Sequence, residues 1–294
     1  MNKNIKIILF NLFIFIILLG LFEIGLFLNY KHHHPEIRYE IREVKYSNFI
    51  DYYKFQPVQG KDYTKRPIIL AGCSFAYGQG LTEKQTFGYK LANLTKRPVY
   101  NISIPGKGLQ HNLYFCQNNM FDKSITNPEY FVYIIMSDQI RRLYTTVCLH
   151  DFTAYPQYVL DKNKKLTLKS DTYPFYKQFY VYYFFNNLYY SFIGYKNYNQ
   201  HSSLVTEYFK EMEKAVKQIY PNIKFVILFY GDYDKYYHLN LSELEKEDMI
   251  LIHTQDLSPE NIFSIEYHLT KTDFHPNENA WNLLTPLFAK ELNL

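Results

Sequence analysis

Cysteine is scarce in this chain of 294 residues, which contains only Cys73, Cys116 and Cys148. None of the three belongs to a C-x-x-C pair, and no histidine stands at zinc-finger spacing from them. This pattern disfavours a disulfide framework and a structural zinc site, although one disulfide with a leftover thiol stays open. Because unpaired cysteine behaves as a small apolar residue, we expect these side chains to be buried.

Clusters of basic residues are also lacking. The formal net charge is only +4, and the lysines and arginines are interspersed with acids. A nucleic-acid-binding surface needs cations gathered on one face or stripe, so we predict no nucleic-acid partner. The 31 tyrosines and 24 phenylalanines are spread along the whole chain. Against that background, a single aromatic residue is weak evidence for a sugar-binding platform.

Long hydrophobic runs are limited to one, at residues 7–28. As a helix this run would extend about 33 Å, which is enough to cross the hydrocarbon core of a bilayer. Lys3 and Lys6 precede the run, and no A-x-A-like cleavage site follows it. We therefore expect residues 1–29 to be an uncleaved, single-pass membrane anchor. The globular part would then be extracytoplasmic, in a periplasm or at a cell surface.

Glu23 is the one acid inside this hydrophobic run. An ionisable side chain within a membrane span is costly and is by default a candidate for function. The simpler interpretation, which we favour from the sequence, is that Glu23 lies near the outer interface or is protonated.

Beyond the anchor, the sequence divides into two regions of different composition. Residues 30–65 are polar and irregular and predict a stalk, whereas residues 66–294 predict one folded domain. Within that domain, short apolar runs typical of buried strands lie at 67–71, 98–104, 130–136, 223–229 and 249–252. Stretches with the apolar spacing of helices lie at 87–94, 109–120, 204–219 and 280–288. Residues 142–200 show neither of these apolar patterns and are interpreted as an aromatic-rich insertion.

Strands that alternate with amphipathic helices predict a three-layer α/β/α sandwich around a central parallel sheet. Sheets of this kind place their functional sites at the carboxyl ends of the strands. Residues that directly follow the predicted strands are therefore the first candidates for chemistry.

The sharpest local signal is Gly72-Cys73-Ser74, directly after the first predicted strand. Glycine allows the backbone to turn tightly there. The backbone N–H of Ser74 could then donate to an oxyanion. Taken alone, however, a G-x-S sequence is weak evidence, because an ordinary turn serine gives the same pattern.

The second signal is K-T-D-F-H-P-N at residues 271–277, just before the last predicted helix. A serine hydroxyl is a poor nucleophile at neutral pH and needs a base to take its proton. His275 suits that role, and Asp273 could hold its tautomer and stabilise its cation. Asn277 is also well placed to cap the last helix, which is compatible with a catalytic role for its neighbours.

Together these two signals resemble the SGNH (GDSL-like) hydrolases over about residues 66–292, apart from the insertion. That family has a nucleophilic serine after its first strand and an aspartate and histidine near its C-terminus. The resemblance implies a flavodoxin-like strand order and a triad of Ser74, Asp273 and His275. Two departures are that Cys73 replaces the aspartate of the G-D-S motif, and that only Phe274 separates Asp273 from His275.

The resemblance also implies an oxyanion hole of three donors. Two are the backbone N–H groups of Ser74 and Gly106. The third donor in the family is an asparagine after the third strand, and here Ser137-Asp138 occupies that place. Serine donates a hydrogen bond but reaches less far than asparagine, and losing one such donor can cost about 100- to 1000-fold in rate.

Several alternatives stay open at this stage. An α/β-hydrolase would need G-x-S-x-G, whereas this chain has G-C-S-F-A. Cys73 could be a thiol nucleophile, although no cation lies near it in the sequence. Arg141 and Arg142 could meet an anionic substrate, but the favoured interpretation is that they are surface cations.

The sequence therefore predicts an esterase or acyl-hydrolase that acts on an acyl ester of an extracytoplasmic glycan or lipid. We expect no metal and no organic cofactor. The same triad could instead transfer the acyl group to a carbohydrate, or the fold could serve a non-catalytic binding protein. Which small molecule, glycan or lipid is the substrate, and which protein partners exist, cannot be deduced from sequence.

Overall fold

The structure is a computed structural model that describes most of the chain. Described are residues 3–33, 53–55, 65–143, 156–163, 165–170, 198–231, 241–258, 261–262 and 264–294, together with 179, 181–182, 184–185 and 188–189. Cys148 lies outside the described residues. Cys73 and Cys116 are free and buried, as expected.

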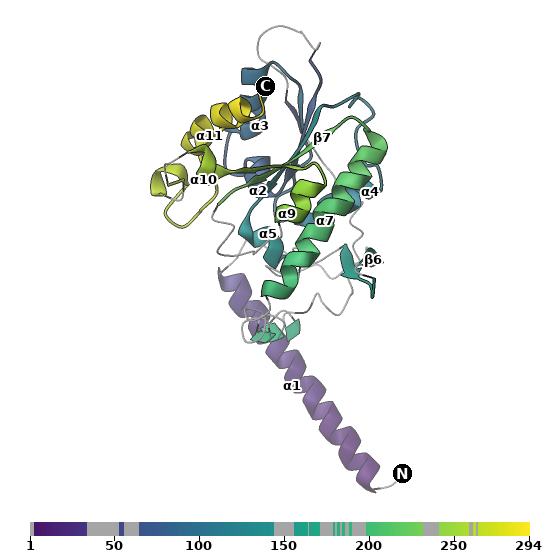
Figure 1. Ribbon diagram of the computed structural model, residues 1–294. Helices are drawn as coiled ribbons and strands as arrows, with labels where there is room; N and C mark the ends of the chain where they lie inside the picture. The colour runs from purple at the N-terminus through teal and green to yellow at the C-terminus, as the bar shows by residue number, and fades with distance from the viewer. Residues whose placement is uncertain are drawn as a thin grey trace.

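A six-stranded sheet forms the centre of the domain (Figure 1). In spatial order its strands are β1 (Tyr53–Phe55), β3 (Val99–Asn101), β2 (Ile68–Gly72), β4 (Tyr130–Ile135), β7 (Lys224–Phe229) and β8 (Ile250–His253). The edge strand β1 pairs antiparallel with β3, and all other neighbours are parallel. All five parallel strands coincide with predicted apolar runs, which are continuous because both faces of the sheet are covered.

Helices cover the two faces of this sheet, and Figure 1 shows α3 and α11 on one side and α4 and α7 on the other. Their bounds are α3 (Phe87–Thr95), α4 (Leu109–Gln117), α7 (Tyr198–Ile219) and α11 (Glu278–Glu291). Leu113 and Phe209 belong to the core on one face, whereas Leu91 and Trp281 belong to the core on the other. The predicted three-layer α/β/α sandwich is confirmed.

The order of the parallel strands determines where a ligand site is expected. Counted along the chain, the five parallel strands lie in the order 2-1-3-4-5, which is the flavodoxin-like order. The chain leaves β2 for β3 on one side and then crosses to β4 on the other. The carboxyl ends of β2 and β4 therefore form the switch point of the sheet, where ligands bind in such folds.

The insertion contains a hairpin that the sequence analysis did not predict. Strands β5 (Gln157–Leu160) and β6 (Leu166–Ser170) pair antiparallel. Tyr158 and Leu166 are buried in the core beneath α4 and α7, and the Tyr158 ring packs against Tyr208. The hairpin is thus attached to the domain through its inward-facing side chains.

The N-terminal helix α1 (Lys3–His33) contains a segment, Ile8–Asn29, that is long and apolar enough to cross a membrane. Its mean hydropathy is 2.5, and its side chains are not buried against the rest of the chain. Length and composition alone are weak evidence for a span, because a signal sequence has the same properties.

Gly72 is predicted to be essential for the turn at the end of β2. Its φ is +147°, and a Cβ there would lie 2.7 Å from the Ile134 carbonyl oxygen and 2.9 Å from the Ala76 Cβ atom. We expect Gly72→Ala to lower the free energy of unfolding by more than Gly106→Ala. At Gly106, φ is +75° but no atom lies within 4 Å of the new Cβ, so only the backbone cost of about 1–2 kcal/mol applies.

Urea-induced unfolding of the detergent-solubilised full chain measures both losses. Equal losses for the two variants would show that close packing at Gly72 is not a constraint.

Candidate active site

Ser74 lies at the switch point of the sheet, as the first residue of the short helix α2 (Ser74–Tyr77). Its side chain is buried, with 3% of the residue exposed. The first N–H groups of a helix have no carbonyl partner within that helix, so the Ser74 N–H is not used by the hydrogen bonds of α2. The positive φ of Gly72 produces this abrupt change from strand to helix, as the sequence indicated.

Ser74, His275 and Asp273 form a continuous chain of hydrogen bonds. The Nε2 atom of His275 lies 2.8 Å from the Oγ atom of Ser74. On the other side of the ring, Nδ1 lies 2.5 Å from Oδ1 of Asp273. The backbone N–H of His275 also donates to that oxygen, at 3.1 Å. The three residues that the sequence singled out are thus brought together.

The charge state of Asp273 sets the tautomer of the imidazole. Partial burial by itself raises the pKa of Asp273, but hydrogen bonds from the His275 side chain and backbone outweigh it and hold the pKa below its usual value. An ionised carboxylate accepts hydrogen bonds and cannot donate, so His275 must carry a proton on Nδ1. In a neutral imidazole the other nitrogen, Nε2, is then a base facing the Ser74 hydroxyl.

The loop that carries Asp273 and His275 is a small closed hairpin. His268 pairs with Pro276, and the Leu269 N–H donates to the His275 carbonyl at 3.0 Å. Asp273 and His275 contact each other, whereas Phe274 between them is 64% exposed. Side chains two residues apart share a face of an extended segment, which explains how a D-x-H sequence serves a triad.

Asn277 fastens this hairpin to the helix that follows it. Its Oδ1 atom accepts from the N–H groups of Asn279 and Ala280, which caps α11 as expected. Its Nδ2 atom donates to the carbonyls of Glu266 and His268, at 2.7 and 2.8 Å. One side chain therefore fixes both the start of α11 and the base of the hairpin that carries Asp273 and His275.

Because Asn277 has both roles, two substitutions at this position are expected to have different effects. Asn277→Ala removes the cap and the hairpin contacts, so we expect a loss of at least about 1–2 kcal/mol in unfolding free energy. Asn277→Asp keeps the capping oxygens but loses the amide donor, so we expect a smaller loss of stability together with a clear loss of any activity that depends on the geometry of Asp273 and His275. Thermal unfolding and initial-rate assays on the same samples measure the two effects. An Asn277→Asp protein with wild-type activity would contradict the role in the hairpin.

The His275 ring also has an aromatic neighbour. The Phe75 ring lies 5.1 Å from the imidazole, centroid to centroid, and packs edge-on against Tyr230. Burial raises the pKa of Tyr230, so its phenol stays neutral at any working pH. Packing by these rings limits the positions open to the imidazole.

The alternative of a thiol nucleophile at Cys73 is not supported. Cys73 is fully buried, and its Sγ atom lies 3.9 Å from Ser74 Oγ. The imidazole contacts the serine hydroxyl, which is therefore the group in position to be deprotonated.

The three predicted oxyanion donors follow three adjacent strands. Ser74 follows β2, Gly106 follows β3, and Ser137 begins α5 (Ser137–Arg141) directly after β4. Gly106 adopts a positive φ and borders open space, while Ser137 is exposed. Since neighbouring strands lie about 4.8 Å apart, these residues share one edge of the sheet. Their role as oxyanion donors stays a prediction.

Three buried amide side chains that the sequence analysis missed organise this edge. Asn101 donates to the Ala76 carbonyl at 2.8 Å and accepts from the Ser103 N–H, joining the end of β3 to α2. Asn112 donates to the Gly108 carbonyl at 3.1 Å and lies within 3.4 Å of the Gly72 carbonyl. Gln139 accepts from the Met136 N–H and donates to the Tyr133 hydroxyl, which fixes the turn at Ser137.

Arg142 departs from its interpretation as a surface cation, because it is only 7% exposed. Its guanidinium donates to the Asp138 carboxylate at 2.7 Å and to the Lys107 carbonyl at 3.0 Å. The residue thereby links α5 to the loop that contains Gly106. The side chain of Arg141 is outside the described part of the structure.

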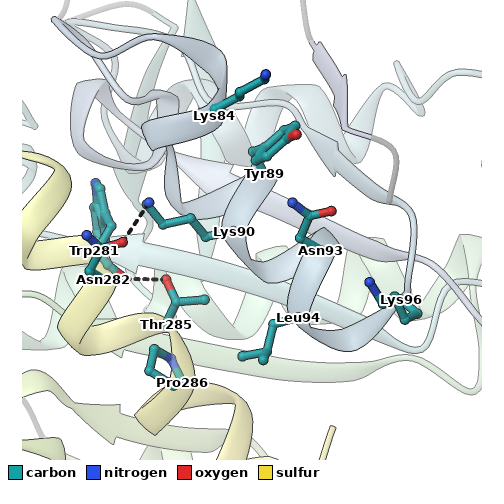
Figure 2. Close-up of a pocket in the computed structure, with 10 residues that line it drawn as sticks. All are labelled: Lys84, Tyr89, Lys90, Asn93, Leu94, Lys96, Trp281, Asn282, Thr285 and Pro286. Carbon is teal, nitrogen blue, oxygen red and sulfur yellow. Dashed lines mark hydrogen bonds between the residues drawn. The ribbon is translucent and has the colours of Figure 1, made fainter. Parts of the chain in front are cut away.

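A groove of about 540 Å³ lies apart from these residues, between α3 and α11 (Figure 2). Lysine, asparagine and tyrosine side chains line it, and none of the triad residues does. Lys90 is already bound there to Asn282 and Glu278, at 2.7 and 3.3 Å. The groove follows a seam between two helices and is not part of the candidate active site.

No family model and no curated protein matches the chain. Among solved structures, an acetyl xylan esterase from the rumen bacterium Butyrivibrio proteoclasticus is 10% identical, with a TM-score of 0.47 over 78% of this chain and 64% of that one. A protein described as lipolytic, of the G-D-S-L family, from Desulfitobacterium hafniense is 10% identical, with a TM-score of 0.46 over 77% of this chain and 99% of that one. A family two carbohydrate esterase from Cellvibrio japonicus is 10% identical, with a TM-score of 0.42 over 78% and 62%.

The chain thus spans less than two thirds of the length of these two carbohydrate esterases. Identities and scores this low carry no functional argument.

Proposed function

We propose that this chain is a serine esterase of the SGNH type that works through an acyl-enzyme intermediate. The observation that carries the proposal is the unbroken chain from Asp273 through His275 to Ser74, with the base nitrogen 2.8 Å from the hydroxyl oxygen. A base within hydrogen-bond reach of a buried hydroxyl, and itself oriented by a carboxylate, is the arrangement that activates a serine.

The proposed reaction begins when Ser74 Oγ attacks the carbonyl carbon of an ester. The hydroxyl proton moves to His275 Nε2 as the new C–O bond forms, and Asp273 stabilises the resulting imidazolium. The carbonyl oxygen becomes an oxyanion, which the N–H groups of Ser74 and Gly106 and the side chain of Ser137 stabilise. Collapse of this intermediate breaks the bond to the alcohol, which takes the proton from Nε2.

The second half of the reaction releases the acyl group. A water molecule gives its proton to His275 and attacks the acyl-enzyme, and the proton then returns to Ser74 as the carboxylic acid leaves. Side chains of this chain carry every proton in these steps. If a sugar hydroxyl took the place of water, the same steps would transfer the acyl group to the sugar.

We further propose that α1 anchors the domain outside the cytoplasm, so that the substrate is an acyl ester of an extracytoplasmic glycan or lipid. Support comes from the length and hydropathy of Ile8–Asn29 and from the lysines that precede it.

Pre-steady-state hydrolysis of p-nitrophenyl acetate tests the proposed chemistry. We expect a burst of p-nitrophenol, one per active site, in the wild-type chain and none in Ser74→Ala or His275→Ala. Cys73→Ala serves as the matched control and should keep the burst. A folded wild type that releases no p-nitrophenol above the uncatalysed rate would instead support a non-catalytic binding protein. A burst that survives in Ser74→Ala would eliminate the proposed nucleophile.

Asp273→Asn tests the role given to the carboxylate. An amide can donate to Nδ1 and so stabilise the wrong tautomer, as happens in the Ser-His-Asp proteases, where the corresponding change lowers kcat about 10⁴-fold. We expect a fall in kcat of about 10³- to 10⁴-fold with little change in KM. A loss of less than about tenfold would mean that Asp273 does not orient the base.

A further inference from the structure

Glu23, the one acid in the apolar part of α1, has a partner in the structure. Its Oε2 atom accepts a hydrogen bond of 2.7 Å from the backbone N–H of Val181, which lies in the insertion. The neighbouring Phe22 packs edge-on against Phe184, with ring centroids 5.7 Å apart. Two consecutive residues of the anchor therefore contact the same short segment of the insertion.

The residues of α1 at this contact have the spacing of one helix face. Between residues 21 and 29, only Glu23, Leu26 and Phe27 are partly covered, and the other side chains are exposed. Positions i, i+3 and i+4 lie on one face of a helix. One face of α1 is thus covered at the level where the insertion meets it, while the remaining faces stay open.

The insertion itself presents apolar side chains beside this contact. The described pairs 181–182, 184–185 and 188–189 are helical. Within them Phe184, Phe185, Leu188 and Tyr189 are 41–55% exposed. The apolar side chains of α1 are exposed to a similar degree. The two surfaces adjoin where the Phe22 ring contacts Phe184. A contiguous exposed apolar surface of this kind is typical of a membrane-contacting site.

The position of Glu23 along α1 indicates how deep this apolar surface would lie in a bilayer. Glu23 lies six residues before Asn29, where the candidate span ends. At 1.5 Å per residue this is about 9 Å, which is the depth that apolar side chains of interfacial segments reach. Tyr is enriched at that level of a bilayer, and Phe and Leu are typical of the apolar face of interfacial helices. Figure 1 also shows α5, which follows β4, on the side of the domain toward α1.

We propose that the described residues 181–182, 184–185 and 188–189 form a second membrane contact, bound to the lipid bilayer itself at the boundary between headgroups and acyl chains. Glu23 holds the segment against the anchor, while Phe184, Phe185, Leu188 and Tyr189 enter the lipid. Membrane attachment at two points, α1 and the insertion, keeps the carboxyl edge of the sheet close to the bilayer surface. The proposal rests on α1 crossing the bilayer and does not depend on the reaction at Ser74.

Tryptophan fluorescence of the full chain in phosphatidylcholine vesicles tests this placement. Phe185→Trp adds a reporter at the proposed contact, and Leu94→Trp adds one at an equally exposed apolar position on α3. Trp281 is fully buried and contributes the same background to both. We expect brominated phosphatidylcholine to quench the Phe185→Trp reporter and lipid to shift its emission to the blue, while Leu94→Trp shows neither. Equal quenching of the two reporters, or a chain that does not float with the vesicles, would overturn the proposal.

Glu23 is tested in the Phe185→Trp background. Glu23→Gln retains an oxygen that accepts from the Val181 N–H, whereas Glu23→Leu retains none. We expect Glu23→Gln to keep most of the quenching and Glu23→Leu to lose it. Wild-type quenching in Glu23→Leu would overturn the tethering role. Because no readout involves hydrolysis, these outcomes are independent of whether the chain is an esterase.

Discussion

The hydrogen bond between His275 Nε2 and Ser74 Oγ joins two segments that are 201 residues apart in the chain. It forms only if α11 and β2 hold a fixed relative position, because each positions one partner. Trp281 of α11 is fully buried, and its ring packs against Phe87 and Tyr230. Since buried cores are close-packed, this face of the sheet locates the hairpin that carries Asp273 and His275. The geometry of Ser74, His275 and Asp273 thus depends on packing by residues outside this group.

Buried side-chain amides hold the loops at the carboxyl ends of the strands in place. Asn101, Asn112 and Gln139 are buried and bind backbone atoms in the loops that follow β2, β3 and β4. A buried amide is costly unless it is hydrogen-bonded, so each of these residues favours one loop conformation over others. Asn277 does the same for the hairpin that carries Asp273 and His275. A rigid edge of this kind suits a site whose donors must be in place before charge develops.

Much of the architecture was predictable from the sequence because its signals are local. Apolar runs indicated all five parallel strands, and Gly72-Cys73-Ser74 and Asp273-x-His275 are each readable within a few residues. Asn101 and Asn112 were missed because each also binds a distant partner, Ala76 at 25 residues and Gly72 at 40 residues along the chain. The partners of Gln139 are near in sequence, but no turn at Ser137 was predicted that would have pointed to it. Arg142 was assigned to the surface by its charge, which the Asp138 carboxylate compensates. The β5–β6 hairpin was missed because apolar and polar residues do not alternate clearly in this aromatic-rich part of the sequence. The hydrogen bond between Glu23 and Val181 joins residues 158 positions apart, so no local sequence pattern indicates it.

The central claim is that Asp273 and His275 activate Ser74, and labelling with a fluorophosphonate probe tests it most directly. Such a probe forms a stable bond only with an activated nucleophile, and peptide mapping by mass spectrometry then identifies the modified residue. The account predicts one adduct per chain, on Ser74, that is absent from His275→Ala. A folded wild-type chain that stays unlabelled, or an adduct that maps to Cys73 or to another serine, would contradict it.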